Sequence, residues 1–436
     1  MSPADWDRLE FYSRKVKLFQ GLFFDIPQIH PSTYFRIAQL RSSTLFPSLR
    51  TLQYNLDESP FSESYIFLFL SPVLDTLELF DIAGSENTIV GPFLATLPSQ
   101  MLTQIVLHSG RISADIFKKS IVHLKQLRSL ELLNAVFIGD FVLWEVLGSL
   151  PSLADLTLTT DDPGPESHPA HAPEKSNSQS GGPKYFDALE SLSVMGSLPL
   201  IHYLLGFIDS LYLNSIEIYP VIQVNHFRNE HEPEDLFTSS MMIIASKWSR
   251  SLVNFVICSP SQRTGSAQQG QRYAISRSLM SLTVLQEMQT FHILDWRMKI
   301  MNDDVKRLAM SWPKLRSLEL PHSQFISLSI LRIIAENCPE LRHLDILLDT
   351  STIPPFDTSS KSLRHNLEVL TVGNLRAHSS DTTITQTMLE CQIKVAQYLD
   401  LIFPYLKSIE VEPKDDVTWS VIRDLVKLCQ NARQVK

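Results

Sequence analysis

Two polar stretches hold the residues whose types could do chemistry. His168 and His171, in the stretch HPAH, have a spacing that a metal ion could use. They fall in the segment 161–183, which has no further His or Cys and is dense in Pro, Ser and Gly. The second stretch follows a predicted strand and contains four titratable residues: His226, Glu230, His231 and Glu232. We interpret both stretches as solvated surface loops, because both are strongly polar and the first also lacks large apolar residues.

The rest of the sequence lacks the short motifs that mark common active sites. It contains no G-x-S-x-G, no P-loop, no G-x-G-x-x-G and no H-E-x-x-H. The cysteines are far apart and form no C-x-x-C pair, which indicates neither a disulfide framework nor a zinc site. They are Cys258, Cys338, Cys391 and Cys429. We therefore expect free buried thiols in a reducing compartment, no cofactor or metal, and no enzymatic activity.

A short apolar frame, L-x-x-L-x-L, recurs along nearly the whole chain. In the stretch WPKLRSLEL, Leu315, Leu318 and Leu320 fill this frame. A short strand there would bury the last two leucines on one side. Its other side would carry three residues: Ser317, Glu319 and Pro321. Thirteen such frames begin at Leu49, Leu74, Leu102, Leu127, Leu153, Leu189, Leu213, Leu252, Met288, Leu315, Leu341, Leu367 and Leu406. The first five are 25 to 28 residues apart, which is typical of leucine-rich repeats.

The chain before Leu49 is expected to close one end of the stack. A degenerate frame over residues 13–18 would place Val16 and Leu18 in the last two buried positions. Residues 6–12 before it are predicted to form a short helix that covers the open end of the sheet.

The segments between frames have helical spacing. Ile330, Ile333 and Ile334 would share one face of a helix over 329–337. Asp303 and Asp304 are expected at the N-cap of the preceding helix. One strand and one helix per repeat predict an α/β leucine-rich-repeat solenoid of about 13–14 repeats. In this right-handed horseshoe, a parallel sheet forms the concave face and helices form the convex face.

These patterns divide the chain into three parts. Residues 1–45 are predicted to be a capping or linker segment with the degenerate first repeat. The repeat domain spans 46–412 and contains polar insertions, expected to be disordered, at about 161–183 and 259–272. Residues 413–436 should form a capping helix that buries Val421, Leu425 and Leu428. These boundaries follow from the first and last clear frames.

Composition narrows the possible partners. A net charge of −9 and a pI near 5.8 argue against nucleic-acid binding, which usually needs a basic face. The N-terminus has charges throughout and no apolar core of a secretory signal. The longest apolar run, at 65–70, is far too short to span a membrane. We expect a soluble intracellular protein, located in the cytoplasm, the nucleus or both.

The concave face supplies the candidate binding residues. In each frame, the residue between the last two buried positions should point out of the sheet. This column contains six acidic residues and no basic one: Gln53, Glu78, Val106, Glu131, Thr157, Ser193, Glu217, Val256, His292, Glu319, Asp345, Thr371 and Glu410. Its negative field would favour a basic segment of a partner protein. The alternative is that the glutamates only keep an exposed strand soluble. Apolar candidates flank the column at Phe80, Tyr219, Leu294 and Leu347.

Several segments resemble the F-box/leucine-rich-repeat proteins of mushroom-forming fungi. They are DWDRLEFYSRKVKLF, LFPSLRTLQY, FLSPVLDTLEL and LPSLADLTL. In that family, a W-x-R-F-x-x-Y-A-x-x-V-x-x-L segment follows the F-box. Six residues roughly occupy this pattern, with the aromatic pair one position out of step: Trp6, Arg8, Phe11, Tyr12, Val16 and Leu18. The resemblance covers almost the whole chain, although L-x-x-L-x-L is itself a general packing pattern.

The resemblance implies a function but also reveals a missing part. An F-box would precede Trp6, where this sequence has only five residues. The chain therefore resembles the recognition half of a substrate receptor of a Skp–cullin–F-box ubiquitin ligase. Either the start codon lies further upstream or this paralogue has lost the F-box. A Skp-type adaptor would be a partner only in the first case. The alternative is a free-standing leucine-rich-repeat interaction protein with no ubiquitin role.

Overall fold

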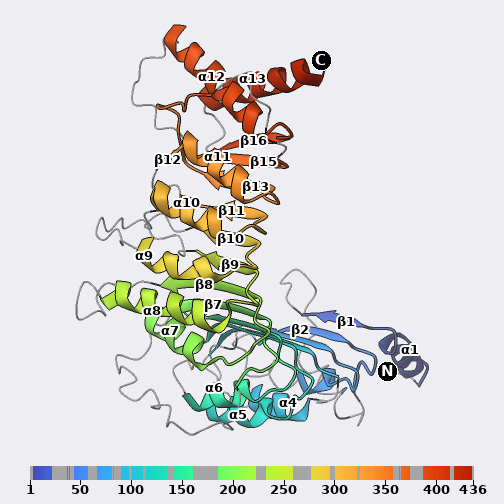
Figure 1. Ribbon diagram of the computed structural model, residues 1–436. Helices are drawn as coiled ribbons and strands as arrows, with labels where there is room; N and C mark the ends of the chain where they lie inside the picture. Colours follow the sequence, from blue (N-terminus) through green and yellow to red (C-terminus); the bar gives the residue numbers. More distant parts are fainter. Residues whose placement is uncertain are drawn as a thin grey trace, which may run out of the picture. The chain divides into compact units, whose positions relative to one another are not determined.

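The computed structural model describes most of the chain as two compact units (Figure 1). The described residues are 3–21, 37, 39, 44–56, 66–80, 82, 90–97, 101–110, 114–135, 141–160, 185–221, 232–258, 276–294, 300–321, 325–356, 363, 365–373, 386–412 and 417–434. The first unit comprises Met1–Leu213 and Val221–His226, and the second comprises Asn214–Pro220 and Phe227–Lys436. The predicted insertions at 161–183 and 259–272 lie outside the described residues, as do the histidine stretches around His168 and His226.

The first unit is a parallel sheet in which each strand pairs with the next in the sequence. Its strands are β1 (Leu18–Gln20), β2 (Thr51–Asn55), β3 (Thr76–Phe80), β4 (Gln104–Gly110), β5 (Ser129–Ala135), β6 (Asp155–Thr159) and β7 (Ser191–Ser197). Its helices are α1 (Pro3–Ser13), η1 (Ile66–Phe69), α4 (Val90–Thr96), α5 (Ala114–Ile121), α6 (Phe141–Gly148) and α7 (Leu198–Phe207).

The second unit repeats this arrangement with parallel pairing between successive main strands. These strands are β8 (Ser215–Val221), β9 (Asn254–Ile257), β10 (Thr290–Ile293), β11 (Ser317–Glu319), β13 (His343–Ile346), β15 (Val369–Gly373) and β16 (Ser408–Glu412). A separate small sheet pairs β12 (Ile326–Ser327) with β14 (Leu348–Asp349). The helices are α8 (Glu232–Lys247), α9 (Ser276–Leu279), η3 (Met280–Val284), α10 (Asn302–Ser311), α11 (Leu328–Asn337), α12 (Gln386–Ile402) and α13 (Val417–Gln434).

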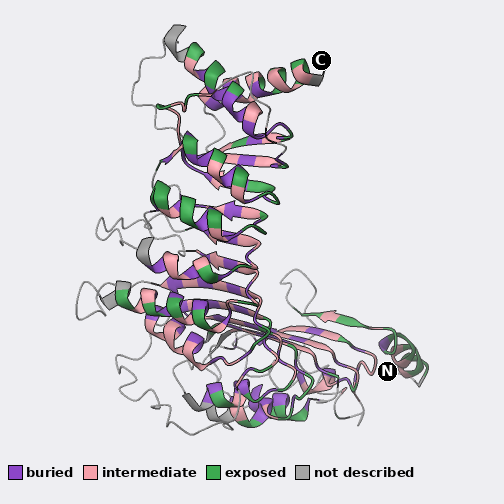
Figure 2. Ribbon diagram, in the orientation of Figure 1, coloured by how far each residue is buried: buried purple, intermediate pink, exposed green. Residues whose placement is uncertain are grey.

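The repeated leucine frame accounts for this architecture. Leu318 is buried and pairs in register with Phe291 and Leu344 on the neighbouring strands. Alternate residues along the strands are buried, and the residues between them are mostly part-exposed (Figure 2). Each fully buried apolar side chain contributes roughly 1.5–3 kcal/mol, so stacked frames build a continuous core. The prediction of an α/β leucine-rich-repeat solenoid is confirmed, with fourteen strands in the main sheet order.

The helical segments pack on the buried side of the sheet. The Trp312 ring, which follows α10, lies 4.5 Å from the Phe291 ring of β10, centroid to centroid. Its indole N–H donates to the carbonyl of Leu282, 3.2 Å away. In α11, Ile330 and Ile334 are buried as expected, whereas Ile333 is half-buried. These contacts leave the opposite side of the sheet as the outward face.

The start of α10 differs in detail from the prediction. Its N-cap is Met301, and Asp303 and Asp304 lie in the first turn. The Asp304 carboxylate reaches back and accepts a hydrogen bond of 2.9 Å from the Met301 N–H. An acidic residue there accepts a hydrogen bond from a backbone N–H that has no partner within the helix. Its negative charge also interacts favourably with the positive end of the helix dipole. The aspartates therefore stabilise the helix start from one turn further inside.

The first repeat has a different register from the predicted one. Strand β1 pairs Phe19 with Leu52, which places the half-buried Phe19 at the frame position that Leu52 fills on the next strand. Leu18 is 49% exposed and Val16 is only half-buried, so both were assigned wrongly. Phe19 contacts the aromatic ring of Phe69 at 4.3 Å between centroids. This aromatic contact sets the register that the leucine pattern alone could not reveal.

The C-terminal helix forms as predicted but buries another face. Trp419, Ile422 and Val426 are buried in α13, whereas Leu428 is 63% exposed. A helix rotates by about 100° per residue, so a shift of one or two residues in the buried stripe exposes Leu428. Arg433 of α13 also pairs with Asp400 of α12. The two helices therefore lie side by side after the last repeats (Figure 1).

The cysteines are free, as predicted, but most of them are less buried than expected. All four cysteines are free, but only Cys338 is buried, and the other three are half-buried. Burial raises the pKa of the Cys338 thiol to about 12.

Pro321, expected on the outward side, is buried. Of the helices in the described ranges, none combines the length and apolar character needed to cross a bilayer.

Candidate protein-binding face

The outward face of the first unit carries the predicted column of residues in register. Pairing between successive strands aligns Gln53, Glu78, Val106, Glu131, Thr157 and Ser193. All are half-buried except Val106, which is 7% exposed. Strand alternation puts one such residue on each strand, about 4.8 Å from the next. We call these residues, with their counterparts in the second unit, the outward column.

Hydrogen bonds join the first members of this column into a chain across four strands. The Gln20 amide donates to Gln53, and the Gln53 amide donates to Glu78, each over 2.6 Å. The other carboxylate oxygen of Glu78 lies 3.1 Å from Nε2 of His108. Both oxygens of Glu78 therefore have partners, so this acid is held in one orientation. A fixed carboxylate is a better recognition element than a mobile one, because less conformational entropy is lost on binding.

An aromatic pair borders this chain. The Phe80 ring stacks on the His108 imidazole, with centroids 4.0 Å apart and 13° between the planes. The structure thus brings two predicted site residues, Glu78 and Phe80, to the same histidine. Sequence reasoning missed His108, although it follows Leu107 just as Phe80 follows Leu79. Reading this second outward position for polar residues as well as apolar ones would have found it.

The second unit carries the rest of the outward column. Strand register aligns Glu217 with Val256, then His292, Glu319, Asp345, Thr371 and Glu410. Glu319 and Asp345 are direct neighbours on β11 and β13. Glu410 lies on β16 and is exposed. The predicted alignment is therefore observed here too, while a binding role for these residues stays a prediction.

His292 sits at the acidic part of this column. Its Nε2 lies 2.8 Å from the Ser317 hydroxyl, and its Nδ1 lies 3.6 Å from a Glu319 carboxylate oxygen. Burial lowers the pKa of His292, while nearby Asp345 raises it and His343 lowers it further. Burial is the largest of these effects. The histidine thus adds a donor to the acidic neighbours without requiring a permanent positive charge.

The first strand of this unit pairs an aromatic residue with an acid. The Tyr219 hydroxyl donates to Glu217 over 3.1 Å. Burial first, and then Glu217, raise the pKa of Tyr219 to about 12. Two of the predicted site residues are thus in contact. The other two apolar candidates differ, because Leu294 is 43% exposed whereas Leu347 is buried at 7% and offers no surface to a partner.

This face presents hydrogen-bond acceptors beside aromatic rings. Two of its acids, Glu78 and Glu217, accept hydrogen bonds from neighbouring side chains. An incoming Lys or Arg side chain would therefore join existing hydrogen bonds rather than meet bare charges. Within the ranges that the structure describes, no group of three His, Cys, Asp or Glu side chains could hold a metal ion.

Comparisons with known proteins add a likeness in fold. No family model and no curated protein matches the chain. A protein from Bacteroides fragilis is 12% identical with a TM-score of 0.37, over 64% of this chain and 76% of that one. An internalin (inlF) from Listeria monocytogenes 4b F2365 is 14% identical with a TM-score of 0.35, over 90% and 92%. A chain of the Rad7 and Elc1 complex in yeast is 14% identical with a TM-score of 0.37, over 94% of this chain and 83% of that one. These values carry no conclusion about function.

Proposed function

We propose that this protein is a non-enzymatic recognition scaffold whose outward sheet face binds a segment of another protein. The observation that supports it most is the in-register outward column, in which half-buried acids stand beside aromatic side chains. Glu78 with Phe80, and Glu217 with Tyr219, are the two examples at hand. Such pairs offer an acceptor and an aromatic surface together, and aromatic residues are enriched at protein interfaces.

The partner segment that suits this face is rich in Lys and Arg. The outward column contains acids and no basic residue, and Glu319 and Asp345 are adjacent in register. Opposite charge speeds encounter and excludes acidic competitors, even where it adds little affinity. Packing of aliphatic Lys and Arg stems on Phe80 or Tyr219 would add apolar burial.

For the cellular role, we propose substrate recognition within a Skp–cullin–F-box ubiquitin ligase. This proposal rests on the family resemblance of the segments quoted above. The scaffold would hold the substrate, and other subunits would carry out the transfer of ubiquitin. Binding to a Skp-type adaptor would need an F-box upstream of Trp6. The alternative is a free-standing interaction protein with the same outward face and no ubiquitin role.

Affinity purification from the native source separates these two roles. The protein is tagged at its own locus, and the purified complex is analysed by mass spectrometry. Recovery of a Skp-type adaptor and a cullin, with peptides from upstream of Met1, supports the ligase role. A product that starts at Met1 and carries neither subunit contradicts the ligase role and leaves the free-standing scaffold.

A further inference from the structure

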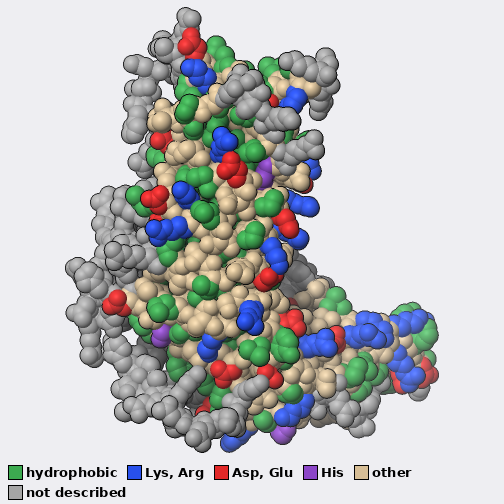
Figure 3. Space-filling view, in the orientation of Figure 1, with side chains coloured by type: hydrophobic (Ala, Val, Ile, Leu, Met, Phe, Trp, Pro, Cys, Tyr) green, Lys and Arg blue, Asp and Glu red, His purple; other side chains and the backbone are tan. Residues whose placement is uncertain are grey.

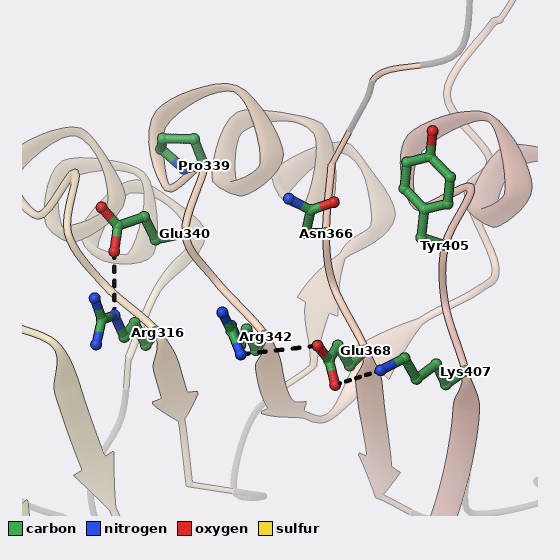
Figure 4. Close-up of a pocket in the computed structure, with 8 residues that line it drawn as sticks. All are labelled: Arg316, Pro339, Glu340, Arg342, Asn366, Glu368, Tyr405 and Lys407. Carbon is green, nitrogen blue, oxygen red and sulfur yellow. Dashed lines mark hydrogen bonds and ion pairs between the residues drawn. The ribbon is translucent and has the colours of Figure 1, made fainter.

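A second surface of the second unit has the opposite electrostatic character. A cavity of about 370 Å³ opens where the chain enters the last strands of the sheet (Figure 4). Eight residues line it: Arg316, Pro339, Glu340, Arg342, Asn366, Glu368, Tyr405 and Lys407. They come from the turns just before β11, β13, β15 and β16. We call this cavity the edge pocket.

The charged lining of the edge pocket comes mostly from one position of the repeat. Arg316, Arg342, Glu368 and Lys407 each follow the first apolar residue of their frame. Stacked repeats place these side chains in a row, and acidic and basic side chains lie close together along the edge of this unit (Figure 3). The lining holds three cations and two carboxylates, which leaves one positive charge in excess.

The ion pairs identify which cation is in excess. Nε of Arg316 lies 3.1 Å from Glu340, and Nζ of Lys407 lies 2.9 Å from Glu368. Lys407 and Arg342 both hold the pKa of Glu368 below its usual range, with the Lys407 hydrogen bond as the largest effect. Arg342 also forms an ion pair with Glu368, but its Nη1 lies 4.0 Å from the Glu368 carboxylate oxygen, beyond hydrogen-bond length. Arg342 therefore keeps its donors available between the two closed pairs.

An aromatic side chain lines the edge pocket on the side away from Arg342. Tyr405 is 57% exposed, and its ring faces the same cavity as Pro339 and Asn366 (Figure 4). In Figure 4, Asn366 and Glu368 lie between Tyr405 and Arg342, so the two residues stand at opposite sides of the pocket. Exposed tyrosine and arginine side chains are common anchors at protein interfaces. The pocket thus combines one available cation with an aromatic surface.

We propose that the edge pocket binds an acidic side chain of a partner protein, with a neighbouring apolar residue packed on Tyr405. The planar fork of Arg342 matches a carboxylate, which can accept two hydrogen bonds from it. A single surplus charge suits a single carboxylate. A dense run of phosphates, as in nucleic acid, would instead be repelled by the flanking Glu340 and Glu368.

The edge pocket does not depend on the proposed function of the outward column. Asp345 lies on β13 and Arg342 in the turn just before it, three residues and about 10 Å away, and the two carry opposite charges. A substitution at Arg342 can therefore weaken binding at the edge pocket without affecting binding at the outward column, and a substitution at Asp345 can do the reverse. If both act, a partner would need acidic and basic side chains at about this separation.

An array of random peptides tests the edge pocket with the full-length chain. Wild type is compared with Arg342→Gln and with Arg128→Gln. Arg128 is a matched control, because it occupies the same frame position in the phrase LRSL and is exposed in the first unit. Both variants remove one charge, so any loss of general electrostatic attraction is equal in the two.

Wild type and Arg128→Gln should retain a class of peptides with Asp or Glu next to an apolar residue. Arg342→Gln should bind that class about tenfold more weakly, as expected for one charge-assisted contact. Glu368→Gln should bind it more tightly, because a competing carboxylate is gone. Tyr405→Ala should lose the preference for the apolar neighbour. Absence of this class in wild type, or equal losses in Arg342→Gln and Arg128→Gln, would overturn the proposal.

Discussion

The carboxylate of Glu78 lies 3.1 Å from the imidazole of His108, although the two residues are 30 positions apart in the sequence. They face each other because β3 and β4 are neighbouring strands of a parallel sheet. Both side chains are mostly buried, with 20% and 29% of their surfaces exposed. The contact therefore belongs to the folded surface before any partner arrives, which makes it measurable in the free protein.

A double-mutant cycle should detect coupling between these two residues. Glu78→Ala and His108→Ala are expected to interact by about 0.5–1 kcal/mol in the free energy of unfolding, measured by denaturant titration. Glu145→Ala on α6 is exposed, and it should be additive with His108→Ala. Full additivity of Glu78→Ala with His108→Ala would show that the contact contributes nothing.

Leu318→Asp should destabilise the second unit severely. Leu318 is 3% exposed and lies between Phe291 and Leu344, so aspartate would bury an unpaired charge. We expect a loss of about 4 kcal/mol or more in the free energy of unfolding.

Met310→Asp provides the control for that substitution, because Met310 lies in the same repeat and is 60% exposed. It should cost less than about 1 kcal/mol. Thermal unfolding followed by circular dichroism compares the two variants. Equal melting temperatures for Leu318→Asp and wild type would show that the strand register is wrong.

The free energy of unfolding should decrease as the pH drops below about 6.5, the ordinary pKa of histidine. His365 is 3% exposed, its Nδ1 accepts from the Leu367 N–H, and its Nε2 lies 2.8 Å from the Cys338 carbonyl. Burial lowers the pKa of His365, and the bond to Cys338 only partly offsets this. The unfolded chain thus binds the proton more tightly than the folded chain.

The sign of the pH effect follows from this difference. The contribution of His365 is present above its unfolded pKa and is lost as pH falls toward its lower folded pKa. Urea titrations from pH 7.5 to 5 should show a decline that is smaller in His365→Gln, after correction for the lower stability of that variant. An identical slope in wild type and His365→Gln would contradict the assignment.

Much of the fold could be predicted from the sequence, because the frame reports packing directly. Leu318 and Leu344 are buried for the same local reason, and thirteen repetitions leave little freedom for the strand order. The register of the first repeat could not be predicted in this way, because Phe19, which contacts Phe69, takes the position of the frame leucine. The buried face of α13 could not be predicted either, because this helix has apolar residues on several sides and the sequence does not show which side packs against the protein.

The candidate sites were less predictable for a physical reason. Strand alternation places Glu78 and Glu319 on the outward face, but it does not state what neighbours them. The partners of Glu78, Gln53 and His108, come from adjacent repeats at distances that only the register determines. The edge pocket depends on the order of charges at one frame position. Arg342 keeps its donors available there because Arg316 and Lys407 make the short contacts with the two carboxylates.

The central claim, recognition of a basic segment by the outward column, is tested most directly by charge reversal. The full-length chain with Glu217→Lys and Glu319→Lys is compared with wild type for binding Lys- and Arg-rich peptides on the random array at low salt. The double variant Glu145→Lys/Glu336→Lys serves as the control for net charge, because it reverses the same number of charges on two helices. Glu145 is exposed on α6, and Glu336 is half-exposed on α11, where it pairs with Arg332. The account predicts that wild type and Glu145→Lys/Glu336→Lys bind these peptides and that Glu217→Lys/Glu319→Lys binds them at least about tenfold more weakly, with an unchanged melting temperature. Equal binding by all three proteins would contradict it.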